Sequence, residues 1–111
     1  MKEKRNDQFK KGILPMLILH IISKDKNYGY NIVIKFNELC GGMLTIKEGT
    51  LYPILYRLEE DGAIISEWHM PADNSKPKKY YSITSRGRQI LDEQWLVWKE
   101  LEKVVNNFEK I

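Results

Sequence analysis

The strongest constraint on this chain is its last segment, a predicted long helix with more apolar surface than a small protein can cover. Thr84 is suited to cap the helix, and helical periodicity continues to about Phe108. One apolar stripe contains Leu91, Trp95, Trp98 and Val105, and a second contains Ile90, Val97, Leu101, Val104 and Phe108. Exposed, the two stripes would form a patch too large for a monomer. We therefore predict homodimer contacts by Leu91, Val97, Leu101, Val104, Val105 and Phe108.

Composition limits the remaining possibilities. The 111 residues suffice for one domain with a modest core, and 30% of them are charged. The longest apolar run, residues 13–22, is too short to span a bilayer, and no secretion signal is recognisable. The single cysteine, Cys40, cannot form an intrachain disulfide. These features predict a soluble, cytoplasmic protein with no membrane partner.

Two apolar helices are predicted in the first forty residues. Residues 8–23 are apolar on nearly all sides, and Pro15 implies a kink or a late start of that helix. Asn27 is expected to cap a second helix, from Tyr28 to about Leu39, which the Gly41–Gly42 pair ends.

A third helix and a hairpin are predicted to follow. Thr45 and Glu48 have capping-box spacing, apolar residues recur from Leu51 to Leu58, and Gly62 ends the helix. Pro53 suggests that regular helix begins nearer Thr50. Residues 63–70 and 78–84 are β-prone segments separated by a loose, polar stretch, which favours a two-stranded hairpin.

The order of elements predicts a mainly α fold with a small β-hairpin. Three helices followed by a hairpin form a winged helix-turn-helix, and the long C-terminal dimerisation helix is an addition to it. We assign residues 1–84 to a DNA-binding domain and residues 85–111 to the dimerisation helix, within one continuous structural unit.

The third helix carries the predicted contacts to double-stranded DNA. The second helix of a helix-turn-helix enters the major groove, with its N-terminal residues facing base edges. The residues expected to make these contacts are Lys47, Gly49, Thr50, Tyr52, Pro53, Tyr56 and Arg57. Residues 49–58 contain no acidic side chain, whereas residues 59–61 are all acidic and would be repelled by phosphate. An ordinary solvated helix face is the alternative interpretation.

Basic residues at the hairpin are expected to hold the DNA backbone. Lys76, Lys78 and Lys79 lie at or beside its tip, where they could neutralise phosphates without reading sequence. The net charge of +3 is only mildly basic, so this local clustering matters more than the total. A second basic cluster, at Lys2, Lys4, Arg5, Lys10 and Lys11, is interpreted as a solubilising tail, with a DNA-contacting arm as the alternative.

Catalysis is not predicted from the residues. His20 and His69 lie far apart, Cys40 has no base near it in sequence, and no spacing of His and Cys fits a metal site. We therefore expect neither enzyme activity, nor a metal, nor a cofactor.

With these residues placed, the chain resembles the PadR family of transcriptional regulators, in particular its short single-domain members. The matching stretches are residues 28–32 (YGYNI), 49–59 (GTLYPILYRLE), 62–65 (GAII) and 79–87 (KYYSITSRG). The Gly-Thr-Leu-Tyr-Pro block is highly specific to the family, whereas the Thr-x-x-Gly step at Thr84 is shared by many winged-helix regulators.

The resemblance implies a homodimer that represses a nearby promoter and is released by a small molecule. Short members bind planar aromatic compounds between their C-terminal helices, at positions that correspond to Trp98, Trp95 and Glu102. Pro15 of the first helix is expected to line the same site. Two tryptophans at this spacing also lie on one side of a helix, so interface packing is the alternative role for them.

The sequence therefore favours a ligand-responsive repressor. A winged-helix protein-interaction module that does not bind DNA is the runner-up, and a ligand carrier without regulatory activity is a third hypothesis. Salt distinguishes the first two, because DNA affinity falls steeply with ionic strength.

Overall fold

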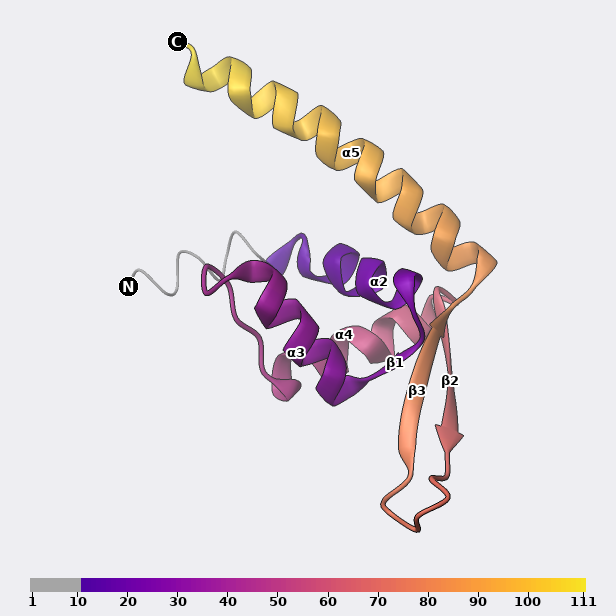
Figure 1. The fold of residues 1–111 in the computed structure, drawn as a ribbon. Coiled ribbons are helices and arrows are strands. Elements are labelled where there is room, and N and C mark those ends of the chain that lie inside the picture. Colours follow the sequence, from indigo (N-terminus) through magenta and orange to yellow (C-terminus); the bar gives the residue numbers. More distant parts are fainter. Residues whose placement is uncertain (1–10) are drawn as a thin grey trace.

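The structure is a computed structural model and describes residues 11–111 (Figure 1). Its helices are α2 (Leu14–Lys24), α3 (Gly29–Cys40), α4 (Glu48–Glu60) and α5 (Ser85–Glu109), and its strands are β1 (Asn27–Tyr28), β2 (Ile64–His69) and β3 (Lys78–Ile83). The fold is mostly helical, with a small antiparallel sheet and a long C-terminal helix. The predicted fold class is confirmed.

The core lies where α2, α3 and α4 meet the base of the sheet. Its largest fully buried side chains are Phe36, Ile18, Leu19, Ile22, Ile32, Leu51, Leu55 and Ile64. Burying each such side chain stabilises the fold by about 1.5–3 kcal/mol. α2 has buried residues on several sides because α3, α4, α5 and β3 all contact it. This packing fixes α4 against α3.

Pro15 lies at the beginning of α2, the point at which a kink or a late start was predicted. The helix begins at Leu14, so Pro15 lies in its first turn, where a missing backbone N–H costs nothing and the fixed φ angle suits the helix. Residues 8–10 of the predicted first helix lie outside the described residues, as do Lys2, Lys4, Arg5 and Lys10 of the basic cluster.

The predicted cap of α3 is wrong. Tyr28, rather than Asn27, occupies the N-cap position, and its side chain makes no capping hydrogen bond. The Asn27 side chain accepts hydrogen bonds from the Tyr28 backbone N–H at 3.0 Å and from the Asn31 amide at 2.7 Å. Asn27 is unavailable as a cap because it forms strand β1 with Tyr28 and pairs with β3.

The capping box predicted before α4 is also wrong. α4 begins at Glu48, two residues before the predicted start at Thr50, and its N-cap is Lys47 rather than Thr45; the Lys47 side chain makes no capping hydrogen bond. Asn37 of α3 holds the preceding turn instead. Its side chain donates to the Ile46 carbonyl at 3.1 Å and accepts from the Ile46 backbone N–H at 2.9 Å.

The sheet has three strands rather than the predicted two, in the order β1-β3-β2. β2 and β3 pair antiparallel from Ile64 opposite Ile83 to His69 opposite Lys78, and form the wing seen beside α4 in Figure 1. β1 adds Asn27 opposite Tyr81 and Tyr28 opposite Tyr80. The extra strand ties the base of the wing to the start of α3.

Thr84 caps α5, as predicted. Its hydroxyl oxygen accepts the Gly87 N–H at 2.9 Å and donates to the Gly62 carbonyl at 2.6 Å, which links the new helix to the turn before β2. Gly87 is required here because a Cβ atom would clash with the Ala63 carbonyl. Beyond its first turns, α5 extends away from the rest of the fold (Figure 1).

Candidate nucleic-acid interface

The seven residues predicted to contact DNA from the third helix lie on α4 or at its N-cap, and all of them are exposed. Leu51, Leu55 and Leu58 are buried and fix the rotation of the helix. The exposed members of the predicted set are Lys47, Gly49, Thr50, Tyr52, Pro53, Tyr56 and Arg57. They divide between two sides of α4, because Tyr52 faces the wing whereas Pro53 and Arg57 border a cavity near Pro15.

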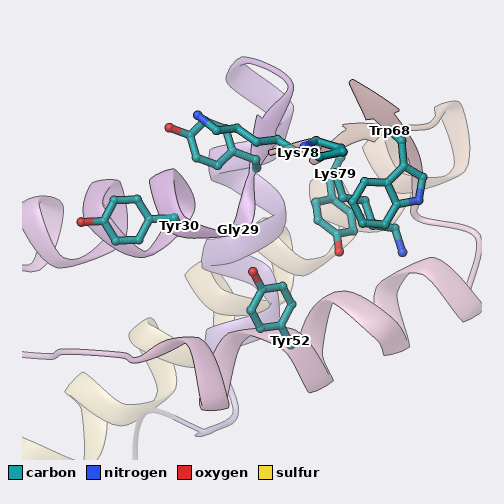
Figure 2. A pocket seen from close by; sticks show the side chains of 9 residues that line it. Gly29, Tyr30, Tyr52, Trp68, Lys78 and Lys79 are labelled. Carbon is teal, nitrogen blue, oxygen red and sulfur yellow. The ribbon is translucent and has the colours of Figure 1, made fainter. Parts of the chain in front are cut away.

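A groove of about 540 Å³ separates α4 and the start of α3 from the wing (Figure 2). We call it the wing groove. Its lining residues are Tyr28, Gly29, Tyr30, Tyr52, Trp68, Pro77, Lys78, Lys79 and Tyr81. Five of them are aromatic and two are cationic, and none is acidic. A surface of this composition suits a polyanion that also presents flat or apolar groups.

Tyr52 reaches across from α4 to the first turn of α3. Its hydroxyl lies against Gly29, where an added Cβ would come within 2.6 Å of the phenolic oxygen. In Figure 2 the ring of Tyr52 stands between α4 and the Gly29 backbone. A larger residue at position 29 would therefore displace the Tyr52 ring, which lines the wing groove.

The two lysines of β3 lie over aromatic rings. The ammonium nitrogen of Lys78 is 4.5 Å from the centre of the Tyr28 ring. The ammonium nitrogen of Lys79 is 5.9 Å from the Trp68 ring centre and 5.8 Å from that of Tyr81. Such cation–π contacts restrict where a flexible lysine places its charge.

Sequence reasoning missed the aromatic part of the wing groove. Trp68 is 66% exposed and Tyr30 is 58% exposed, yet neither was among the predicted site residues. Trp68 pairs with Lys79 across the β2–β3 ladder. Once that register is known, period-two alternation puts Trp68 on the face of β2 that also carries Ser66, whose hydroxyl donates to Glu59 of α4.

The predicted ligand residues are not brought together within one chain. Trp98 lines a cavity of about 340 Å³ with Glu93 and Gln94, whereas Pro15 lines a separate one of about 370 Å³. Trp95 instead packs on α2, where its indole N–H donates to His20 Nδ1 at 3.2 Å. Glu102 is exposed and lines neither cavity.

An apolar strip remains open on the outer part of α5. We call it the α5 strip, and its members are Val97, Leu101, Val104, Val105 and Phe108. Each of them is at least 48% exposed. Leu91, also predicted as a dimer contact, is only 5% exposed because it packs into the core of its own chain. That part of the dimer prediction is corrected.

Residues 11–111 contain neither a side-chain cluster that could hold a metal ion nor a helix suited to cross a membrane. Within this range no group of three or more His, Cys, Asp or Glu side chains is arranged to hold a metal ion. Over the same range, none of the helices combines the length and the apolarity that a membrane crossing requires.

A protein-family model and several known proteins match most of this chain. Residues 18–93 match the model of the transcriptional regulator PadR-like family. A transcriptional regulator from Mycobacterium tuberculosis is 30% identical over 98 residues, which cover 88% of this chain and 87% of that protein. The matched proteins with assigned roles are regulators rather than enzymes.

Solved structures agree with this match. A transcriptional regulator from Clostridium thermocellum superposes with a TM-score of 0.83 at 29% identity, covering 91% of this chain and 97% of that one. Bacillus subtilis PadR in complex with operator DNA superposes with a TM-score of 0.67 at 30% identity. That match covers 77% of this chain but only 47% of the Bacillus protein.

Proposed function

This chain belongs to the PadR-like family of transcriptional regulators, and we propose that it is a sequence-specific DNA-binding repressor that works as a homodimer. The observation that carries the proposal is the exposed side of α4, which lies beside the basic wing groove. Helix residues there can reach base edges in the major groove, while lysines of the wing meet phosphates. The Bacillus relative solved with operator DNA supports this use of the fold.

The exposed apolar surface of α5 supports the homodimer in this proposal. The α5 strip is a continuous apolar surface at the end of a helix that extends beyond the core, and a second copy would remove it from water. A symmetric dimer would present two α4 helices to half-sites roughly 34–36 Å apart. Residues 1–84 would then serve as the DNA-binding part and residues 85–111 as the dimerisation part, in the cytoplasm.

Release by a small planar aromatic ligand completes the proposal. Trp98 offers a flat indole at the edge of the cavity that borders the α5 strip, and Glu93 supplies a nearby acidic group. A ligand there would touch α2 and α5 and so could alter the spacing of two DNA-binding heads. It acts only if it binds the DNA-free conformation better than the DNA-bound one.

The decisive experiment is a mobility-shift titration on the promoter of the chain's own gene, with Thr50→Ala and Tyr52→Ala as test variants. Both side chains are exposed on α4, so we expect a folded protein whose operator affinity falls by roughly tenfold or more. Gln89→Ala, an exposed substitution on α5, is the matched control and should bind normally.

The same titration at two salt concentrations tests the runner-up, an interaction module without DNA. A specific complex weakened by salt supports the repressor. Normal operator binding by both α4 variants would show that the recognition surface is misplaced. If the unmodified protein selects no sequence from a random DNA pool, the proposed function is wrong.

A further inference from the structure

We propose that the wing groove holds the sugar–phosphate backbone of one DNA strand, with Trp68 packed against that strand and Lys78 and Lys79 held at its phosphates. This inference rests on the proposed function and adds to it a strand-binding site whose central residue is an exposed tryptophan. Base reading stays with the outward residues of α4. The wing groove contributes affinity that does not depend on sequence.

The composition of the wing groove matches a DNA strand better than it matches a small molecule or a protein. A DNA backbone alternates anionic phosphates with apolar sugar faces, and the groove combines ammonium groups with the aromatic rings beside them. Its lining contains no carboxylate to repel phosphate. Tyr30 adds an exposed ring at the α3 side of the opening (Figure 2).

Position also favours a strand of the same duplex that α4 would read. Tyr52 belongs both to the exposed side of α4 and to the lining of the wing groove. A duplex seated on α4 therefore brings its flanking backbone to the groove between that helix and the wing. The wing cannot swing away freely, because β1 pairs Tyr28 with Tyr80 at its base.

The aromatic rings give the lysines a preset position. Lys78 rests on Tyr28, and Lys79 lies between Trp68 and Tyr81. A lysine that is already held in place loses less side-chain entropy when it binds phosphate than a free one does. Lys76 lies in the exposed loop at the wing tip, so we expect it to contribute less than Lys78 or Lys79.

The exposure of Trp68 is not explained by packing within the chain. Its side chain is 66% exposed although it lies at the mouth of a groove, so it contributes little to the core. Ile65, on the opposite face of the same strand, is 61% exposed and lines no part of the wing groove. The two residues form a matched pair, in which only Trp68 should respond to DNA.

The test compares Trp68→Ala with Ile65→Ala on operator DNA and on unrelated DNA. If Trp68 makes one exposed aromatic contact with the DNA strand, its removal should weaken binding roughly two- to fivefold, and two wings in a dimer would multiply the effect. We expect Trp68→Ala to weaken both DNAs by the same factor and Ile65→Ala to leave both unchanged. Thermal unfolding should show both variants folded.

A second readout observes Trp68 directly in the unaltered chain. With 5-fluorotryptophan in all three tryptophan positions, Trp68→Phe identifies the ¹⁹F signal of Trp68. Saturating operator DNA should shift that signal and protect it from solvent. In addition, Lys78→Gln and Lys79→Gln should each reduce the slope of log affinity against log salt by about one unit.

The outcomes distinguish failure of the strand-binding site from failure of the proposed function. If operator DNA binds and Thr50→Ala abolishes binding, but Trp68 neither shifts nor matters, the strand-binding site is wrong while the proposed function stands. If Trp68→Ala weakens the operator but not unrelated DNA, Trp68 reads bases and the assignment to the backbone is wrong. If no DNA binds, the proposed function itself is wrong.

Discussion

The contact between His20 and Trp95 is the clearest case of one residue pair joining the core to the long C-terminal helix. The Trp95 indole donates to His20 Nδ1, and the two rings meet edge to face with centres 5.4 Å apart. Only neutral His20 can accept this hydrogen bond, because both ring nitrogens of a protonated histidine are donors. Burial, and secondarily the charge of Lys24, lower the pKa of His20 below its usual value of 6.5.

Acid should therefore loosen this contact. Since the pKa of His20 is lowered in the folded state, its neutral form stabilises the fold fully above about pH 6.5, and that contribution is lost as the pH falls through the folded-state pKa. We expect urea unfolding of the wild type to lose more stability between pH 7 and pH 5 than that of His20→Gln, in which His69 is retained. NMR titration should give the lowered pKa directly. Equal pH dependence of the two proteins would contradict this role.

Residue types and spacing predicted which side chains of α4 are exposed, but they did not predict which residues the Trp95 side chain contacts. The exposed polar residues of α4 could be predicted because helical periodicity separates them from Leu51, Leu55 and Leu58. Trp95 was expected at a ligand site, but it packs on His20, more than seventy positions away in the chain. Helical periodicity predicts the face of the helix on which a side chain lies. It does not predict which residue of another element that side chain contacts.

At the scale of elements, Thr84 fastens α5 to the wing. Its hydroxyl satisfies one N–H of the first helical turn and donates to the Gly62 carbonyl, which lies in the turn between α4 and β2. One side chain thus joins the first turn of α5 to the turn between α4 and β2.

Removing this hydroxyl should cost measurable stability. Loss of an N-cap costs about 1 kcal/mol, and leaving the Gly62 carbonyl unpaired adds about 1 kcal/mol, so Thr84→Ala should destabilise by roughly 1–3 kcal/mol. Urea unfolding at one fixed protein concentration measures it, since dimerisation would make stability depend on concentration. Ser85→Ala, the exposed neighbour, should change stability by less than about 0.5 kcal/mol. Similar losses in the two variants would argue against a special role for Thr84.

The helix caps show that an element boundary can be predicted from local sequence only when no residue from another element takes part in it. Thr84 was predicted correctly because a polar cap precedes a long periodic run, and its hydroxyl can accept the Gly87 N–H while donating to the Gly62 carbonyl. Asn27 has the right chemistry for a cap, but the two-residue strand β1 recruits it into the sheet. A strand of that length leaves no alternating pattern to read. The turn before α4 is fixed by Asn37, nine positions from its partner Ile46.

At the scale of the whole molecule, α5 makes the protein elongated. The principal extents are 61, 34 and 20 Å, and the outer half of the helix carries the α5 strip. Fold class followed from the order of helices and β-prone segments, because each of those signals is local. The wing groove did not, because it requires residues of β1, α3, α4, β2 and β3 to meet.

A charge placed in the α5 strip should separate the proposed dimer. Leu101 is 54% exposed, so Leu101→Glu leaves the core intact but would bury an unpaired carboxylate at the interface. Sedimentation should show a monomer, and operator affinity should fall at least tenfold because a single head remains. Lys99→Glu, on the opposite side of the helix, should stay dimeric. A variant Leu101→Glu that sediments as a dimer would place the interface elsewhere.

The pairing of β1 with β3 sets an order of events during synthesis. Position 27 leaves the ribosome long before position 81, its partner in the sheet, so α2, α3 and α4 can associate while the sheet is still open. The groove between helix and wing closes only when β3 emerges, and α5 follows last. A nascent chain thus completes the wing groove before the exposed apolar strip of α5 has emerged.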